Sequence, residues 1–386
     1  MHVHRSALVA IALGSLLCLS LAFAGTAQAK GLTKTEKLGQ FLFFDTSLSQ
    51  PAGQACAACH GSAVGWTGPD QAVNLTGAVY PGALDPNFGN RKPPAAAYAG
   101  DSPILYYDSK VGSWIGGMFW DGRATGKRLG DPLAEQAQGP FLNPLEQNNL
   151  DAAAVVAKVQ ASSYARLFEA VWGRGIFADT TAAYEAIARS IAAFERSSTV
   201  SAYSSKYDAY LAGRATLTEA EKNGMDLFMG QANCSNCHVP PQFTDYSYDN
   251  LGIPKNPLNP FYSELDFNTA GPAWVDYGLG GYLQTTGVDA SAELGKFKVP
   301  TLRNVDKRPY PTFVKAYGHN GYFKSLWAVV HFYNTRDVLP WPAPEVAANI
   351  NTTELGNLGL TRGQENDIVA FLGTLSDGYK PTVHSH

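Results

Sequence analysis

Two copies of the pattern Cys-x-x-Cys-His carry the most specific chemistry in this chain. They consist of Cys56, Cys59 and His60, and of Cys234, Cys237 and His238. In c-type haem attachment, two thiols with this spacing add to the haem vinyl groups and the adjacent histidine ligates the iron. A thioredoxin-like thiol pair or half of a zinc site also uses Cys-x-x-Cys, but neither requires the histidine in both copies. We therefore predict two covalently bound c-type haems.

The first 29 residues have the parts of a secretory signal. A charged start at Arg5 is followed by an apolar run, Ala7–Ala24, and by Ala-x-Ala ending at Ala29. Cleavage there would remove the fifth cysteine, Cys18, whose preceding leucines argue against lipid attachment. No later segment has about 18 uninterrupted apolar residues, so no transmembrane segment is expected. Export and covalent haem attachment together predict a periplasmic protein.

Composition and charge exclude one class of partner. The chain has 29 basic and 33 acidic residues, a formal charge of −4, and removing Arg5 leaves 28 against 33, or −5. An acidic chain of this kind gives no indication of nucleic-acid binding. The 386 residues less the 29 of the signal leave 357, enough for two ordinary domains.

An internal repeat indicates where those domains lie. Leu32–Phe43 recurs as Leu217–Phe228 with seven of twelve positions identical, and each copy opens with a capping box, Thr33 with Glu36 or Thr218 with Glu221. Each copy precedes a haem motif. We predict one cytochrome c-like domain at residues 30–200, with the peroxidatic haem, and a second at 201–380, with the electron-transfer haem.

Periodicity supports a mainly α fold made of these two tandem cytochrome c-like domains, each with one covalent haem. Apolar residues at helical spacing predict closing helices within Thr181–Ser197 and after a capping box at Thr361. Ser198–Ala215 is interpreted as the passage between domains. Gly65–Gly117 and Pro240–Leu294 are rich in Gly, Pro, Asn and Asp, which predicts long loops with few short strands.

Four further motifs give the chain a family resemblance. They are Phe119-Trp120-Asp121-Gly122-Arg123, Leu142-Asn143-Pro144-Leu145-Glu146, Phe297 to Val305, and Tyr317-Gly318-His319-Asn320-Gly321. With the haem motifs, they resemble the bacterial di-haem cytochrome c peroxidases and, within them, the methylamine-utilisation (MauG-like) branch. The resemblance spans nearly the whole mature chain. It implies an oxidoreductase in which the N-terminal haem reacts with hydrogen peroxide and the C-terminal haem relays electrons.

The resemblance also implies roles for individual residues. Glu146 would be the distal acid/base at the N-terminal haem, with Gln136 as a polar neighbour and Pro140 shaping the pocket. Trp120 would carry electrons between the haems, and Arg123 would pair with a haem propionate. Each has a purely structural alternative: a helix-cap carboxylate for Glu146, a core aromatic for Trp120 and an ion pair for Arg123.

Missing ligands distinguish the two irons. Between Lys30 and Asn233, His60 is the only histidine, and Asn90 occupies the region where ordinary peroxidases of this family carry a distal histidine. The N-terminal iron is therefore expected to be five-coordinate or water-ligated. No methionine follows Met229, and Tyr317 matches the tyrosine ligand of the methylamine-utilisation branch. His319 is the rival ligand, and a buried tyrosine bonded to a loop is the structural alternative.

Two departures from the family limit the resemblance. Lys92 stands where the family's inter-haem calcium site takes an asparagine side chain, and its cation disfavours calcium. Ala232 stands where the methylamine-utilisation enzyme has a surface tryptophan for its protein substrate. The predicted partners are hydrogen peroxide and either a small periplasmic electron-donor protein or a protein substrate. The alternative function is a di-haem electron-transfer cytochrome without peroxidase chemistry, which would need both irons capped.

Overall fold

The computed structural model describes residues 31–381, so the predicted signal at residues 1–29 lies outside the described residues. From Leu32 onward the chain packs as one compact unit. Within the described range it contains twelve α-helices and four strands of two or three residues each. The prediction of a mainly α, loop-rich chain is confirmed.

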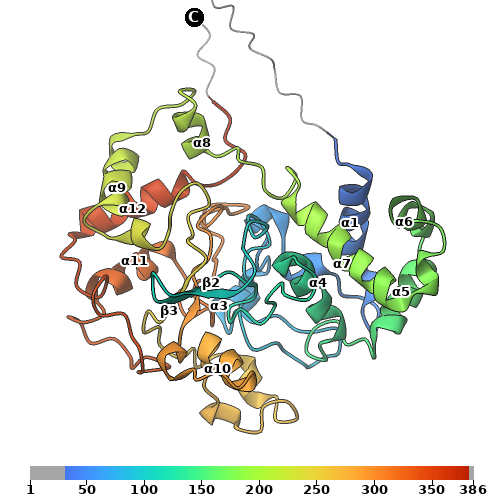
Figure 1. The fold of residues 1–386 in the computed structure, drawn as a ribbon. Helices are drawn as coiled ribbons and strands as arrows, with labels where there is room; N and C mark the ends of the chain where they lie inside the picture. The colour runs from blue at the N-terminus through green and yellow to red at the C-terminus, as the bar shows by residue number, and fades with distance from the viewer. Residues whose placement is uncertain (1–30, 382–386) are drawn as a thin grey trace, which may run out of the picture. The chain divides into compact units, whose positions relative to one another are not determined.

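Seven helices belong to the N-terminal half, which we define as residues 31–200. They are α1 (Lys34–Phe44), α2 (Cys56–Cys59), α3 (Gln71–Leu75), α4 (Pro132–Leu142), α5 (Ala152–Gln160), α6 (Ala165–Trp172) and α7 (Thr180–Arg196). The longest, α7, packs against α1, α4 and α5 (Figure 1). It coincides with the closing helix predicted from apolar spacing, and its buried face includes Ile187, Ile191 and Phe194.

Five helices belong to the C-terminal half, residues 201–381. They are α8 (Lys206–Leu211), α9 (Glu219–Met229), α10 (Gly278–Thr285), α11 (Leu326–Thr335) and α12 (Arg362–Gly373). As α1 does with α7, α9 packs against the closing helix α12 (Figure 1). The predicted passage at 198–215 contains α8, which begins with a capping box of Ser205 and Asp208 that the sequence analysis missed.

The four strands form two small antiparallel pairs. β1 (Tyr106–Asp108) and β2 (Ser113–Ile115) make a hairpin in which Tyr106 pairs with Ile115. β3 (Tyr248–Asp249) pairs with the distant β4 (Phe297–Lys298), with Tyr248 opposite Lys298. The second pair joins two segments that are far apart in the sequence. It places Lys298 in the cavity beside the second haem-attachment motif.

The sequence repeat has a clear structural reason. Both predicted capping boxes form, at Thr33 and at Thr218. The glycine shared by the two copies lies where the helices cross: a Cβ on Gly39 would lie 1.9 Å from the Ser190 carbonyl oxygen, and one on Gly224 would lie 1.8 Å from that of Asp367. Only glycine permits such close backbone approach. The duplicated segment therefore encodes the same helix crossing twice.

Each half has its own apolar core. One cluster includes Phe43, Phe141 and Phe194, and another includes Phe228, Phe243 and Phe371. Arg91 connects the halves, since its guanidinium lies 2.6 Å from Asp121 and 2.6 Å from Asp276. The boundary between residues 200 and 201 remains a prediction.

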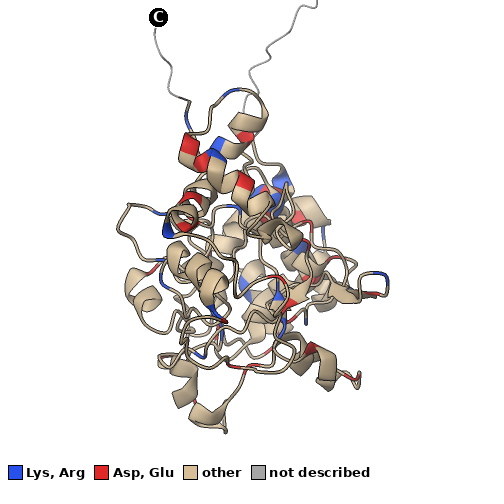
Figure 2. Cartoon of the chain, turned by 90° about the vertical axis from the view of Figure 1, so that its left-hand side faces the viewer, with Lys and Arg blue, Asp and Glu red and all other residues tan. Residues whose placement is uncertain are grey.

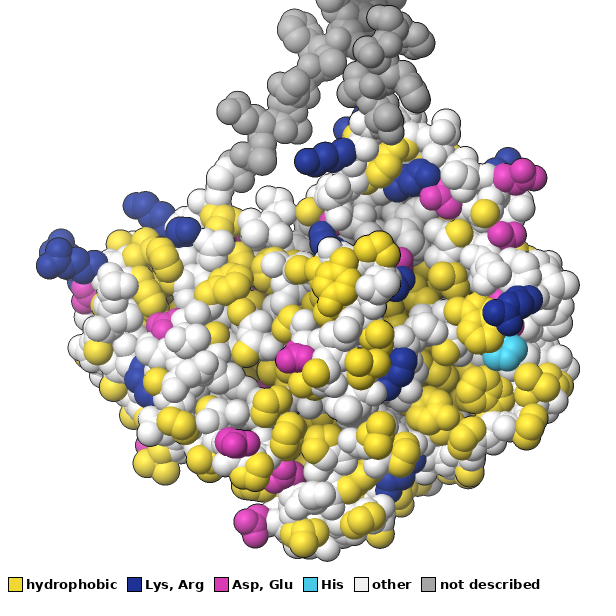
Figure 3. Space-filling view, turned by 180° about the vertical axis from the view of Figure 1, so that it is seen from behind, with side chains coloured by type: hydrophobic (Ala, Val, Ile, Leu, Met, Phe, Trp, Pro, Cys, Tyr) yellow, Lys and Arg dark blue, Asp and Glu magenta, His cyan; other side chains and the backbone are white. Residues whose placement is uncertain are grey.

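The surface is sparsely charged. Only 16% of the chain's residues are Asp, Glu, Lys or Arg. Figure 2 shows the positions of acidic and basic residues, which are mixed along the chain. Figure 3 shows hydrophobic side chains over much of the opposite face from that of Figure 1, interrupted by isolated charged groups. No helix among the described residues is long and apolar enough to cross a membrane.

Candidate functional site

The two Cys-x-x-Cys-His motifs present their histidines in the same way. In the first, the single turn α2 carries Cys56 and Cys59, and His60 follows it with Nδ1 3.2 Å from the Trp66 carbonyl oxygen. In the second, Nδ1 of His238 lies 2.9 Å from the Phe243 carbonyl oxygen. An Nδ1–H that donates to a carbonyl leaves the lone pair on Nε2, which is the form of imidazole that binds a metal.

Burial also favours the metal-binding form of both histidines. It lowers the pKa of His60 to about 4, with a smaller contribution from the charge of Lys92. Burial also lowers the pKa of His238. Both imidazoles are therefore neutral at physiological pH and can act as ligands without first losing a proton.

The four cysteines fit haem attachment better than the alternatives. All four are free thiols. Burial raises the pKa of each of them, for example to about 12 for Cys234, whereas a thioredoxin-like pair needs a lowered pKa. Among the described residues, the cluster that could hold a metal ion contains Cys237, Asp249 and Glu354. It takes only one thiol from one motif, so it does not support a structural zinc site.

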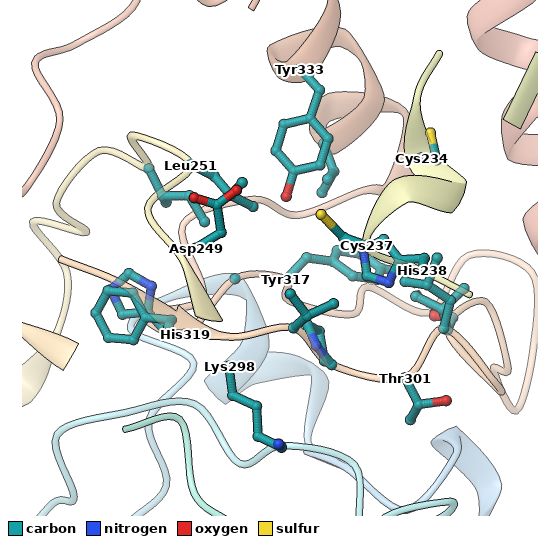
Figure 4. Close-up of a pocket in the computed structure, with 18 of the residues that line it drawn as sticks. Cys234, Cys237, His238, Asp249, Leu251, Lys298, Thr301, Tyr317, His319 and Tyr333 are labelled. Carbon is teal, nitrogen blue, oxygen red and sulfur yellow. Dashed lines mark hydrogen bonds between the residues drawn. The ribbon is translucent and has the colours of Figure 1, made fainter. Parts of the chain in front are cut away.

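A large cavity adjoins the second motif (Figure 4). Cys234, Cys237 and His238 line it together with mainly apolar side chains from α11, α12 and the loop after β4. Apolar walls and a neutral imidazole suit a flat, hydrophobic macrocycle such as haem. Cys234 and Cys237 would hold the haem through thioether bonds, and His238 would ligate its iron.

Tyr317 and His319 both line this cavity but differ in how they are held. Tyr317 is half-buried, and its phenol lies 3.4 Å from the Val305 carbonyl oxygen, so the loop hydrogen bond considered in the sequence analysis is present. His319 is stacked on Phe297 at 3.5 Å, with Nε2 3.4 Å from Glu345. Figure 4 shows His319 at the side of the cavity away from Cys237 and His238. Tyr317 is thus the less restrained of the two candidate ligands.

Other cavity residues were missed by the sequence analysis. Tyr333, on α11, points toward Cys237, and Asp249, on β3, lies beside it (Figure 4). Burial raises the pKa of both side chains. No local motif marks either residue: Tyr333 follows apolar residues, and Asp249 lies in the stretch Pro240–Leu294 that was predicted as loop.

Glu146, the predicted distal acid/base, lies near the first motif, and its role there remains a prediction. Glu146 is half-buried and accepts a hydrogen bond from Asn143 Nδ2 at 2.8 Å. Burial raises its pKa, while Asn143 and Arg123 oppose that rise. Besides burial, its charge contributes to the raised pKa of Cys56 and Cys59, which places the carboxylate near both thiols. Gln136 is half-buried on α4, and its side chain makes no hydrogen bond among the described residues.

A second carboxyl group at this motif was not anticipated. Glu195, near the end of α7, is 6% exposed, and its Oε2 has no hydrogen-bond partner among the described residues. Burial raises its pKa to about 8. Its charge, like that of Glu146, raises the pKa of Cys56. No local pattern in the sequence indicates that Glu195 is buried.

Trp120 is buried where the two halves of the chain meet. It is 8% exposed, lines the cavity of the second motif, and also lines a smaller adjoining cavity bounded by Pro94 and Met118. Its indole N–H donates to the Lys92 carbonyl at 2.8 Å, and its own carbonyl accepts from the Lys298 N–H at 2.9 Å. One bond comes from each half of the chain, so Trp120 is a core residue held by both halves, and its role as an electron bridge remains a prediction.

Arg123 and Lys92 have partners of their own. Arg123 pairs with Asp121 at 2.8 Å and covers the Phe119 ring at 3.7 Å, so the ion pair left open by the sequence is present. The Lys92 ammonium is buried and donates to Thr67 Oγ1 at 2.8 Å and to the Pro93 carbonyl at 2.9 Å. Binding of a haem propionate by Arg123, and the expectation that Lys92 disfavours calcium, remain predictions.

A mainly α chain with two haem-attachment motifs and a buried tryptophan bonded to both halves has the features of a di-haem c-type oxidoreductase. Residues 33–216 match the model of the family described as di-haem cytochrome c peroxidase. The methylamine utilization protein MauG of Paracoccus denitrificans (strain Pd 1222) is 36% identical over 90% of this chain and 89% of its own length. The chain belongs to the di-haem cytochrome c peroxidase family, and it is an oxidoreductase.

Further relatives support this assignment. The cytochrome-c peroxidase IdrP1 of Denitromonas iodatirespirans is 28% identical over 90% of this chain and 82% of its own length. The diheme peroxidase BthA from Burkholderia thailandensis E264 has a similar structure, with a TM-score of 0.75 and 28% identity over 91% of this chain and 88% of that one. Membership of the family implies two c-type haems, peroxide as oxidant and a protein partner.

Proposed function

We propose that the protein is a periplasmic di-haem oxidoreductase that reacts with hydrogen peroxide at the haem held by Cys56, Cys59 and His60. Oxidising equivalents pass through Trp120 to the haem held by Cys234, Cys237 and His238. From there they reach an electron-donor protein or a protein substrate. Each haem, when bound, supplies the iron redox chemistry that no side chain of the chain can provide.

The position of Glu146 carries the proposal. Its carboxylate lies near both thiols of the first motif, with Asn143 as its hydrogen-bond donor. Cleavage of the peroxide O–O bond needs a group that removes a proton from one oxygen and returns it to the other, which then leaves as water. Glu146 is suited to this transfer because burial brings its pKa toward the working pH range. Gln136 is retained as a neighbour that orients the peroxide.

The two halves of the chain offer different side chains as iron ligands, which supports different roles for the two haems. The N-terminal half offers His60 but no second histidine, while Met118 packs in a core cluster with Leu129 and Leu133. An iron bound by His60 would therefore have no second histidine ligand from this half and would keep a position for peroxide. In the second cavity Tyr317 would be available as a ligand besides His238, with His319 as the alternative ligand. An anionic tyrosine ligand stabilises higher oxidation states of iron, which suits a site that stores oxidising equivalents.

Glu146→Gln tests the proposal, since glutamine keeps the size of the side chain but cannot take up a proton. We expect peroxide-dependent turnover of an artificial electron donor to fall by about 10²- to 10⁴-fold. The haem spectrum before peroxide and the haem content should not change. Glu185→Gln is the matched control, because Glu185 makes only a surface contact of 3.7 Å with Arg128.

Optical and EPR spectra of the oxidised protein, before and after one equivalent of peroxide, separate the proposal from its rival. A high-spin haem that reacts rapidly with peroxide is the expected result. Two low-spin haems inert to peroxide would instead indicate an electron-transfer cytochrome without peroxidase chemistry.

A further inference from the structure

Tyr98 lies beside the bridge but has no part in the proposed function. It is 2% exposed, and it lines the same small cavity as Trp120, together with Met118 and Pro300. Aromatic side chains around a shared cavity are close enough for electrons to move between them. Tyr98 is therefore placed to reduce an oxidised Trp120.

The Tyr98 phenol is bonded to a base. Its hydroxyl lies 2.7 Å and 2.9 Å from the two carboxylate oxygens of Asp377. Oxidation of a tyrosine is feasible at moderate potential only if the phenolic proton leaves with the electron. A carboxylate at hydrogen-bond distance can accept that proton. Asp377 itself is fixed by Asn304 Nδ2 at 2.9 Å and by the Ser204 N–H at 2.9 Å.

A second tyrosine continues from Tyr98 to the surface. The Tyr203 ring contacts the Tyr98 ring edge to face, with centroids 4.9 Å apart, and its backbone N–H donates to the Tyr98 hydroxyl at 2.8 Å. Tyr203 is 43% exposed. Its own hydroxyl accepts a hydrogen bond from Gln242 at 2.7 Å. The pair thus leads from a buried cavity to solvent in two steps.

The backbone is strained at both tyrosines. Tyr98 has φ of +60° and Tyr203 has φ of +47°, a conformation that is an outlier for bulky residues. Strain of this kind is concentrated at functional sites. The buried Arg303 guanidinium lies over both rings, at 5.4 Å from Tyr98 and 4.9 Å from Tyr203. A fixed cation there opposes a positively charged ring and so favours loss of the phenolic proton on oxidation.

We propose that Tyr98 and Tyr203 form a redox relay, with Asp377 as proton acceptor, that carries oxidising equivalents from Trp120 to the protein surface. The inference rests on the proposed function, which supplies those equivalents from peroxide. The relay would give the enzyme a second exit for oxidising equivalents, besides the haem that His238 would ligate. It ends at Tyr203, where a protein or a small phenolic or aromatic amine reductant can donate an electron.

Oxidised Trp120 takes one electron from Tyr98, whose O–H bond breaks as its proton moves to Asp377, leaving a neutral tyrosyl radical and a carboxylic acid. Tyr203 then returns one electron to Tyr98, Asp377 returns the proton, and Tyr203 loses its own phenolic proton to solvent. The external reductant restores Tyr203. Two such passes supply the two electrons that, with two protons, reduce one peroxide to two waters.

The test uses the holoprotein, mixed with one equivalent of peroxide without a reductant and frozen for EPR. We expect a tyrosyl radical signal that falls at least several-fold in Tyr98→Phe and in Asp377→Asn. Mass spectrometry should show oxidation or cross-linking at Tyr203 in the wild type and much less of either in Tyr98→Phe. Tyr164→Phe is the matched control, because Tyr164 is also buried and bonds to a carboxylate, Asp45 at 2.5 Å, but lines neither cavity.

The outcomes distinguish the relay from the function on which it rests. If the haem spectrum responds to peroxide but the radical signal and the Tyr203 modification survive in Tyr98→Phe, the relay is wrong and the proposed function stands. A haem spectrum that does not respond in the wild type overturns both. Should Asp377→Asn fail to fold, the comparison of Tyr98→Phe with Tyr164→Phe decides, since each removes one hydroxyl and keeps the ring.

Discussion

The indole N–H of Trp120 donates to the main-chain carbonyl of Lys92 at 2.8 Å. A carbonyl oxygen is too weak a base to take the indole proton, so this bond orients the ring without drawing the proton away. The contact is buried, and it joins Trp120 to the segment that carries the buried Lys92 side chain. This hydrogen bond suits a role in which Trp120 loses and regains an electron while its indole keeps its proton.

Trp120→Phe should uncouple the two haems. Phenylalanine keeps part of the aromatic volume but loses the hydrogen bond and is much harder to oxidise. After one equivalent of peroxide, stopped-flow spectra should show a response of the haem at His60 and a response of the haem at His238 that is slowed at least tenfold. Trp172→Phe is the control, since its indole makes a comparable bond of 2.9 Å to Ser190. Equal slowing in both variants would count against a bridging role.

Tyr317→Phe should change the spectrum of only the haem at His238. The phenol is the proposed ligand, so its loss should alter the low-spin signals of that haem in EPR and raise its reduction potential. Tyr333→Phe removes a hydroxyl from the same cavity and should leave the ligation as in the wild type. If His319→Gln alters the haem signals and Tyr317→Phe does not, the ligand is His319.

Gly39→Ala and Gly224→Ala should each destabilise the fold. The added Cβ would lie 1.9 Å or 1.8 Å from a carbonyl oxygen of the crossing helix, so the helices must move apart. Overpacking of this kind costs about 1–3 kcal/mol or more in unfolding free energy. Gly363→Ala is the control within α12, where the nearest atom to an added Cβ is 3.9 Å away. Chemical denaturation should show Gly363→Ala unchanged or slightly stabilised, and an equal loss in all three variants would contradict the crossing.

Glu195 should make stability depend on pH in a defined window. Burial raises its pKa from 4.5 to about 8, so the folded state keeps a proton that the unfolded state releases. Its favourable contribution is complete below about pH 4.5 and is lost as the pH rises through 8, with a slope of about 1.4 kcal/mol per pH unit. Glu195→Gln should flatten this part of the curve of unfolding free energy against pH. An unchanged slope would show that Glu195 ionises normally in the folded protein.

Local patterns in the sequence predicted the parts that local chemistry determines. The capping boxes at Thr33, Thr218 and Thr361 all form, because each requires only residues three positions apart. The repeat in the sequence corresponds to two close helix crossings, at Gly39 and at Gly224. The sequence alone did not show why the two copies share this glycine. The mainly α fold is predicted for the same local reasons.

Contacts between distant segments could not be predicted in this way. Tyr98 and Asp377 are 279 positions apart, and Arg91 and Asp276 are 185 apart. Neither pair belongs to a motif, and a buried ion pair cannot be distinguished from a solvated one when only spacing is known. Glu195 was missed for the same reason, since its burial depends on packing around the first haem motif. The roles of Glu146, Trp120 and Tyr317 remain predictions that the experiments above test.

Trp120 is held through main-chain bonds to Lys92 in one half of the chain and to Lys298 in the other. The rate of electron tunnelling falls exponentially with distance, so a small relative displacement of the halves would weaken the electronic coupling well before either covalent haem could be released. Heating or mild denaturant should therefore abolish cooperation between the haems first. The rate of electron transfer between the two irons would then report whether the two halves still hold their native positions.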